Sequence, residues 1–460
     1  MLPADIDLSN YLATGLVVFD LASRSLRWQT HLDMSTDAAS FKAYAYSPPA
    51  AADTDGDGRL EVFMGTSVGF VYSFTAAGAL RPGFPLQMGE VQAGVSLADL
   101  DGDGRLEVLA ADTRGNVAAF DAATGAERWE RHLASMVAQS ATFADVNGDG
   151  QLDAIVPTAD GRVHVLHGAT GADVAPFPFA TRARIMAPVT PVPPPPSSAA
   201  NAPLTLIVAS FDGFVYFING KTGCADPVDV GETVYSAPLV DDVDGDGRSE
   251  VLIATMNGNV LCLATPWAHH ALTAWPSATP GGSNPSARSR GGAGVFVTDA
   301  SRAAGEASGD AFIVQFTIVD DRPGAAKASA RVAAARQGGE GTASGPYTVV
   351  VTLRVPGLEP EVTAAAYAAP GTYSLALPVP RTRGHGAVSV RMQDAYGLTS
   401  EDAYAVAFHV RYYRILKWLL VGPFTAMAIA LAAGLEGDAA GGLGGLTGAA
   451  AWGTPRAAQD

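Results

Sequence analysis

Residues 53–61 read DTDGDGRLE, and this acidic loop recurs three more times along the chain. The other copies are DLDGDGRLE at 99–107, DVNGDGQLD at 145–153 and DVDGDGRSE at 242–250, and we number the four copies loops 1 to 4. Loops 1 to 3 start 46 residues apart, and loop 4 starts 97 residues after loop 3, which is about two periods. This spacing predicts a protein built from repeats.

The composition of each loop predicts a site for a hard cation. Positions 1, 3, 5 and 9 carry oxygen-bearing side chains, the carbonyl oxygen of position 7 can add a ligand, and glycines at positions 4 and 6 let the backbone curl around an ion. Crowded carboxylates are unfavourable unless a cation neutralises them or some take up protons. A simple Asp-Gly turn is the alternative, but a turn does not require acid at these positions.

The ligand type selects the ion. An all-oxygen set without His or Cys favours Ca²⁺ over Zn²⁺, and the large number of protein ligands favours Ca²⁺ over Mg²⁺. We therefore predict about four Ca²⁺ sites. Their ligands, with each position-7 residue contributing its carbonyl, are Asp53, Asp55, Asp57, Arg59, Glu61, Asp99, Asp101, Asp103, Arg105, Glu107, Asp145, Asn147, Asp149, Gln151, Asp153, Asp242, Asp244, Asp246, Arg248 and Glu250.

The loops belong to longer units. Strands that begin with glycine recur at spacings of 46, 46, 52 and 45 residues, at Gly69, Gly115, Gly161, Gly213 and Gly258. Five units therefore exist although only four carry acidic loops, because PVPPPPSS at 191–198 replaces one loop and cannot chelate an ion. Residues 15–28 supply the two outer strands of a further half unit. Short, evenly spaced strands predict an all-β fold: a β-propeller with five and a half blades, part of a larger ring that continues upstream of Met1.

The repeat resembles a known family. The pattern of DxDGDG followed by a Gly-led strand is similar to the FG-GAP repeats of integrin α-subunit propellers. Longer strings resemble the plant Defective in Exine Formation protein family from about Leu16 to about Pro423: HLDMSTDAASFKAYAYSPPAAADTDGDG, FPLQMGEVQAGV, GETVYSAPLVDDVDGDG, TMNGNVLCLATP and RYYRILKWLLVGP. The resemblance implies a calcium-binding, membrane-anchored protein that supports cell-surface matrix assembly, as in the exine of the pollen wall. Members of that family begin with a signal peptide and earlier blades, which this sequence lacks.

The rest of the chain divides at changes in composition. We predict the propeller at 1–277, a Gly/Ser/Pro-rich linker at 278–294, an Ig-like β-sandwich at 295–411, a transmembrane helix with its flank at 412–435 and a disordered tail at 436–460. An Ala/Gly-rich insertion at 324–344 is predicted to be a disordered loop. The sandwich rests on six strand-like runs at 295–298, 311–319, 347–355, 372–378, 387–392 and 403–410.

A membrane anchor is predicted at 418–435. This stretch has 18 residues without a charged side chain, and Tyr412, Tyr413, Arg414 and Lys417 precede it as an interfacial flank. A buried core helix is the alternative. The positive-inside rule would put this basic flank in the cytoplasm, but exported folded domains override that bias. We predict a single-pass protein of the plasma membrane or endomembranes with its propeller extracellular or lumenal, contacting membrane lipid through 418–435.

Charge and motifs narrow the function. A formal net charge of −17 disfavours nucleic acid as a partner. Residues 115–129 resemble the tryptophan-docking repeat of quinoproteins, but a turn and inter-blade packing of Trp129 account for that pattern. We predict a non-catalytic scaffold or adhesion protein that binds a matrix glycan or protein, with no catalytic residues. The alternative is a quinoprotein-like or polysaccharide-active propeller enzyme. Cys224 and Cys262 could form a disulfide or remain two buried thiols.

Overall fold

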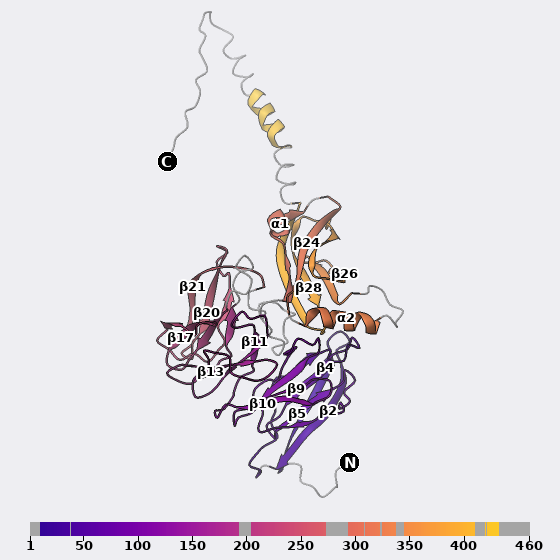
Figure 1. Cartoon of the computed structure of the whole chain (residues 1–460). Coiled ribbons are helices and arrows are strands. Elements are labelled where there is room, and N and C mark those ends of the chain that lie inside the picture. Colours follow the sequence, from indigo (N-terminus) through magenta and orange to yellow (C-terminus); the bar gives the residue numbers. More distant parts are fainter. Residues whose placement is uncertain are drawn as a thin grey trace, which may run out of the picture.

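The computed structural model of this chain describes residues 10–36, 38–192, 204–272, 293–307, 309–322, 324–336, 345–409, 419 and 421–431. Within these residues the fold is all-β apart from short helices, as the sequence predicts. Six small sheets follow one another along the chain, and two further sheets form a sandwich beside them (Figure 1).

We number the six sheets repeats 0 to 5, and within each one the strands pair antiparallel in chain order. Repeat 0 comprises β1 (Tyr11–Asp20) and β2 (Ser25–Thr36). Repeats 1 and 2 comprise β3 (Ala50–Ala52), β4 (Glu61–Gly65), β5 (Phe70–Phe74), β6 (Leu86–Gln87), β7 (Ser96–Ala98), β8 (Glu107–Ala111), β9 (Asn116–Asp121) and β10 (Glu127–His132). Repeats 3 and 4 comprise β11 (Thr142–Ala144), β12 (Asp153–Pro157), β13 (Arg162–His167), β14 (Phe179–Ala180), β15 (Thr190–Val192), β16 (Thr205–Ala209), β17 (Phe214–Asn219) and β18 (Ala225–Asp229). Repeat 5 comprises β19 (Leu239–Asp241), β20 (Arg248–Ala254) and β21 (Val260–Ala268).

Burial falls from the inner to the outer strands of each repeat. Every residue of β8 and β12 is buried, whereas β10 and β21 bury only one residue each. Strands covered on both faces read as continuous apolar runs, such as EVLAA in β8. Inner strands are therefore enclosed between neighbouring sheets, and outer strands face solvent.

The hydrophobic cores lie between consecutive sheets. Each of five clusters of buried side chains joins one repeat to the next. Members of these clusters include Leu16 and Phe74 for repeats 0 and 1, Val71 and Val108 for 1 and 2, Val117 and Leu166 for 2 and 3, Val165 and Val208 for 3 and 4, and Val215 and Val251 for 4 and 5. The sheets therefore stack face to face in chain order.

Two tryptophans link the outer edges of neighbouring sheets through hydrogen bonds. Trp129 on β10 donates a hydrogen bond from Nε1 to the carbonyl of Gly168 in repeat 3, at 2.7 Å. Trp28 on β2 donates to the carbonyl of Ala76 in repeat 1, at 3.1 Å. The turn beneath the Trp129 ring contains Gly171 with φ 68°, where an added Cβ would lie 2.5 Å from the indole. The indole thus requires glycine in that turn.

The sandwich consists of a three-stranded and a five-stranded sheet in the orders β22-β24-β27 and β23-β29-β28-β25-β26. Phe316, Val351 and Val390 are members of the core between them. Its strands are β22 (Ala293–Val297), β23 (Glu306–Ala307), β24 (Ala311–Asp320), β25 (Tyr347–Arg354), β26 (Glu361–Tyr367), β27 (Gly371–Pro378), β28 (Gly384–Gln393) and β29 (Thr399–Phe408). All six predicted strand-like runs coincide with strands of this domain, while β23, β26 and the short helix α1 (Asp299–Ala304) were not predicted.

One prediction within the sandwich is wrong. The insertion at 324–344 contains helix α2 (Ala325–Arg336), where a disordered loop is expected from its Ala/Gly-rich composition. Alanine, lysine and arginine are strong helix formers, and the sequence AAKASARVAAAR contains no glycine. Helix α2 lies between the sandwich and repeats 1 and 2 (Figure 1), with Ala328 and Val332 in their shared core.

The two cysteines are free thiols and both are exposed, so neither alternative left open by the sequence, a disulfide or two buried thiols, describes them. Both line one cavity of about 710 Å³ between repeats 4 and 5, together with Phe217 and Trp267. The thiols are therefore open to solvent at the outer strands of these two sheets.

Several predicted segments fall wholly or partly outside the described residues. These are 193–198 of the proline stretch, most of the linker at 278–294, residues 337–344 of the insertion, the flank at 412–417 and the tail at 436–460. Of the predicted membrane segment 418–435, residues 419 and 421–431 are described and are helical. Within the described ranges, no helix has both the length and the apolar character needed to span a membrane.

We expect Trp129→Ala to destabilise the repeats by about 3–5 kcal/mol, because it removes a buried ring and its hydrogen bond to Gly168. Urea unfolding followed by far-ultraviolet circular dichroism measures the change. Glu130→Ala, at an exposed position on the same strand, is the control and should stay within about 0.5 kcal/mol of the parent. Equal unfolding midpoints for the two variants would contradict the assigned role of Trp129.

Candidate functional site

The four acidic loops occupy equivalent places in the fold. Each joins the first and second strands of its sheet, in repeats 1, 2, 3 and 5. The strand ladder begins at position 9, since Glu61 pairs with Ala52, and Glu107 pairs with Ala98. Asp153 and Glu250 have the same register with Ala144 and Asp241. Position 9 is thereby brought back beside position 1.

A repeated hydrogen-bond pattern shapes each loop. In loop 1 the Asp53 carboxylate accepts the N–H groups of Gly56 at 2.6 Å and Gly58 at 2.9 Å, and both glycines have φ near 85°. In loop 4 Asp242 accepts from Gly245 and Gly247 in the same way, at 2.7 and 3.0 Å. The side chains at positions 3 and 5 each accept the N–H two residues further on, in all four loops.

Several ligand oxygens are left buried without a partner. One carboxylate oxygen of position 9 accepts the N–H of position 2, as in Glu107 with Leu100 at 2.8 Å and Asp153 with Val146 at 3.1 Å. Glu107 Oε1, Asp153 Oδ1 and Asp99 Oδ1 are buried and have no hydrogen-bond partner in the described part of the chain. A buried oxygen without a donor is costly unless a cation satisfies it. The residues of loops 2 and 3 therefore fit a bound cation.

The carboxylates of three loops also converge. Among the described residues, three groups of three carboxylates place one oxygen each within 4.8 Å of one another: Asp53, Asp55 and Asp57; Asp99, Asp101 and Glu107; and Asp242, Asp244 and Asp246. Loop 3 has an amide at Asn147, and its three carboxylates do not form such a group among those residues. The side chains at position 7 in all four loops are exposed, so only their carbonyls remain as candidate ligands: Arg59, Arg105, Gln151 and Arg248.

Burial makes the ionised form unfavourable at positions 1 and 9 of loops 1 and 2 and at position 9 of loop 3. Burial raises the pKa of Glu107 to about 8, and the charges of Asp101 and Asp99 add to the rise. Burial also raises the pKa of Asp153 to about 7. The pKa values of Asp53, Glu61 and Asp99 are raised in the same direction, again chiefly by burial. A cation at each loop would reverse these shifts by favouring the carboxylate forms.

Two arginines beside the loops were not anticipated from the sequence. Arg81 Nη2 lies 3.7 Å from Asp55 Oδ2, and Arg128 Nη2 lies 3.9 Å from Glu107 Oε1. Arg128 pairs more closely with Asp121, at 3.0 Å. The pKa of Glu107 is still raised, because the effect of burial outweighs that of the more distant guanidinium. Neither arginine stands in a recognisable motif. Each comes from an outer part of the sheet, and only the folded sheet brings it to the loop.

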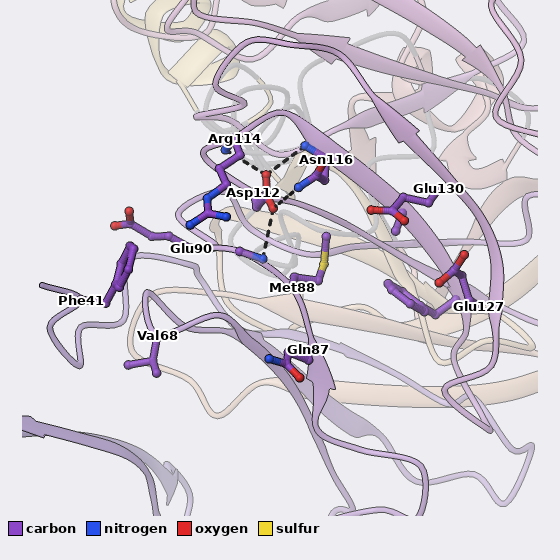
Figure 2. Close-up of a pocket in the computed structure, with 13 residues that line it drawn as sticks. Phe41, Val68, Gln87, Met88, Glu90, Asp112, Arg114, Asn116, Glu127 and Glu130 are labelled. Atoms are coloured by element: carbon purple, nitrogen blue, oxygen red, sulfur yellow. Dashed lines mark hydrogen bonds between the residues drawn. The ribbon is translucent and has the colours of Figure 1, made fainter.

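A pocket at the opposite ends of the strands differs in character. Its volume is about 380 Å³, and Figure 2 shows Glu90 on one side and Glu127 and Glu130 on the other. Asp112 between them accepts the N–H groups of Gly89, Arg114 and Asn116 and the amide of Asn116. Because these bonds hold the β8–β9 turn against repeat 1, Asp112 has a structural role here.

Comparison with protein families assigns both parts of the chain. The DEX1 β-sandwich family model matches residues 294–409. The FG-GAP-like repeat model matches 53–110 and 99–156, spans that begin at the first residues of loops 1 and 2. The chain is thus an FG-GAP repeat protein that carries a β-sandwich. The sandwich is of the DEX1 type, and the chain is a DEX1-like FG-GAP protein.

Other comparisons add little. No curated protein matches the chain. Among solved structures, Saccharomyces cerevisiae Sqt1 is 15% identical over 56% of this chain and 69% of its own, with TM-score 0.40. BBS1N in complex with ARL6DN is 14% identical over 56% and 75%, with TM-score 0.39. BamB from Moraxella catarrhalis is 15% identical over 74% and 90%, with TM-score 0.32. Similarity at this level says nothing about function.

In excess chelator, we expect the free energy of unfolding to fall as pH rises from about 4.5 to about 8. Glu107 ionises near 4.5 in the unfolded chain and near 8 in the folded chain, so the folded state holds more protons across this window. A bound divalent cation replaces those protons, and the fall should disappear in millimolar calcium. Calorimetric melting temperatures between about pH 5 and pH 8 measure both slopes. Glu107→Gln should flatten the slope in chelator, whereas equal slopes with and without calcium would contradict the cation assignment.

Proposed function

We propose that this protein is a calcium-binding, single-pass membrane-anchored scaffold or adhesion protein without catalytic activity. Its repeats would form an FG-GAP β-propeller, and it would serve cell-wall or extracellular-matrix assembly of the exine type. The observation that carries this proposal is the loop hydrogen-bond pattern repeated in four sheets, with converging carboxylates in three of them, in a chain that also has a DEX1 β-sandwich.

Calcium is the ion that best fits the loops. The candidate ligands are all oxygens from carboxylates, one amide and backbone carbonyls, which Ca²⁺ prefers over the softer ions. Buried oxygens without partners at Glu107, Asp99 and Asp153 support a cation inside the loop rather than a solvated acidic turn. The largely buried strands that lead into loops 1, 2 and 3 favour a structural ion over a switch.

The packing of the sheets supports a propeller. Cores between consecutive sheets and fully buried inner strands are features of blades arranged around an axis. The two terminal sheets expose large apolar side chains, including Val17 and Phe19 in repeat 0 and Met256 and Val260 in repeat 5. These exposed faces support a ring with more blades than the repeats described here.

The structural role of Trp129 weakens the enzyme alternative. Its indole donates to Gly168 and covers Gly171, which explains the quinoprotein-like pattern as inter-sheet packing. We place the recognition of a matrix glycan or protein on surfaces outside the loops, because the loop carboxylates are assigned to the cation. The membrane anchor is proposed at 418–435, with the propeller outside the cytoplasm.

We expect the purified chain to bind about four calcium ions, and chelation to lower its melting temperature. At a calcium concentration about 100 times Kd, each site contributes about 2.7 kcal/mol. Replacing Asp55 and Asp57 together by alanine should remove one ion, as measured by equilibrium dialysis with elemental analysis. The matched control replaces Asp226 and Asp229, two exposed aspartates on β18, and should keep all ions. Unchanged stoichiometry in the loop 1 variant would refute that site. A quinone retained at one equivalent, or glycan turnover by the pure protein, would refute the non-catalytic role.

We expect alkaline carbonate to leave the full chain in the membrane pellet after expression in eukaryotic cells. A chain lacking 418–435 should be released, because that segment is the one proposed to reach the bilayer core. Deleting 436–460 instead is the control and should not change the partition. Release of the full chain would argue for the core-helix alternative.

A further inference from the structure

Helix α2 and the β28–β29 turn at 394–398 are two of the segments by which the β-sandwich meets the repeats; a third contact joins His270, after β21, to Phe296. Both segments contact repeats 1 and 2 at loops 1 and 2. Ala328 and Val332 from α2 and Tyr396 from the turn share one buried core with Phe63 and Leu106. The apolar contact therefore reaches the strand and loop residues next to the two candidate calcium sites.

Tyr396 touches the first ligand of both loops. Its backbone carbonyl accepts the N–H of Asp53 at 2.8 Å, and its hydroxyl donates to Asp99 Oδ2, also at 2.8 Å. Asp99 Oδ2 accepts the N–H of Gly104 as well, at 2.9 Å, which leaves Oδ1 as the buried oxygen without a partner. The tyrosine hydroxyl thus fixes the carboxylate in an orientation that reserves Oδ1 for a cation.

The Tyr396 ring is itself held in place. The Arg322 guanidinium lies 5.0 Å from the ring centroid and pairs with Asp320 at 2.8 Å and Asp394 at 2.7 Å. All three charged side chains are nearly or fully buried, and Asp394 also accepts the Tyr396 N–H at 2.9 Å. A buried, mutually satisfied network of this kind is rigid. The sandwich therefore presents the hydroxyl from a fixed platform.

Helix α2 lies directly on loop 2. Lys327 Nζ donates to the carbonyl of Gly102 at 2.7 Å. A Cβ added at Gly104 would lie 2.7 Å from Lys327 Cβ, and one added at Gly324 would lie 1.5 Å from Asp99 Oδ2. Because α2 lies this close to loop 2, the backbone of loop 2 must keep one conformation. Arg331 lies beside loop 1, where its Nε would be 3.5 Å from a Cβ at Gly56.

The charges at this contact favour a bound ion. Loops 1 and 2 carry four carboxyl groups each, eight in all, whereas four basic side chains have been placed beside them: Lys327 and Arg331 from α2, and Arg81 and Arg128 from the repeats. Without a cation the carboxyl groups repel one another, and the loop backbone that Lys327 and Tyr396 contact loses its support. Among the described residues, loops 3 and 4 do not have these contacts, and the hydrogen bonds that the Asp145 and Asp242 carboxylates accept all come from their own loops.

We propose that loops 1 and 2 form the surface on which the β-sandwich docks. Calcium in these two loops, but not in loops 3 and 4, holds the sandwich on the repeats. Tyr396 and Lys327 are the positioning residues. The inference rests on the calcium binding proposed above. Because coupling between two binding equilibria is reciprocal, the docked sandwich also tightens calcium at loops 1 and 2.

Hydrogen exchange of the full chain tests whether calcium holds the sandwich on loops 1 and 2. In calcium, the amides of 325–336 and 394–398 are protected, and chelator should speed their exchange by about tenfold or more as the sandwich lifts. Replacing Asp101 and Asp103 of loop 2 by alanine should have the same effect in calcium, because among the described residues neither side chain forms a hydrogen bond or ion pair with α2 or Tyr396. The matched control replaces Asp244 and Asp246 of loop 4 and should leave the exchange of both segments unchanged.

Tyr396→Phe tests the reciprocal effect while keeping the ring. Loss of the hydroxyl should weaken calcium binding at one site by about tenfold, as measured by calorimetric titration, with the other sites unchanged. Tyr373→Phe is the control, since that hydroxyl donates to Ala369 within the sandwich. Equal calcium affinities in the two variants would argue against Tyr396 as a positioning residue.

The outcomes separate the two proposals. If no loop binds calcium, both the proposed function and this inference fail. If calcium binds but its removal leaves 325–336 protected, only the inference fails, and Lys327 and Arg331 act as fixed counter-charges instead. Exposure of α2 by the loop 4 variant would likewise overturn the specific role of loops 1 and 2.

Discussion

The rest of the structure depends on one constraint, the burial of carboxylate oxygens. These oxygens lie where the first hairpin begins in each repeat that has an acidic loop. Position 9 pairs with the residue just before position 1, so the strand ladder begins where the negative charge is greatest. The strands of that ladder also supply the cores between sheets. Repulsion left unbalanced at a loop would therefore act on the most buried strands, and not on a peripheral turn.

Repeat 4 shows what the acidic loops add. Its first two strands pair without such a loop, Thr190 with Ile207 and Val192 with Thr205, and Thr190 is fully buried. Apolar packing between sheets is thus sufficient to form the hairpin. The acidic loops act on the ends of the hairpins, and the outer edges are held separately by Trp28 and Trp129. Inner and outer parts of a sheet are stabilised by different interactions.

Local patterns in the sequence predicted the parts of the fold that are local. The period of the loops, the Gly-led strands and six of the sandwich strands depend on residues within a few positions of one another. The contact between Tyr396 and Asp99 joins residues 297 positions apart, and no motif marks either partner for the other. The arginines Arg81 and Arg128 were missed for the same reason. Helix α2 was missed because its alanines were interpreted as low complexity, although alanine is the strongest helix former.

Loops 1 and 2 are more buried than loop 4, and this difference affects the rate at which a bound ion would leave. Asp53 and Asp99 are 3% and 8% exposed, and Gly56 and Gly104 beside them are buried, whereas positions 243–248 of loop 4 are exposed throughout. If calcium binds as proposed, ions in loop 4 exchange directly with solvent, while ions beneath the sandwich leave only when it lifts. The protein would then contain a fast and a slow pool of calcium. The slow pool would outlast brief falls in external calcium, so the join between the two domains would follow average rather than momentary concentration.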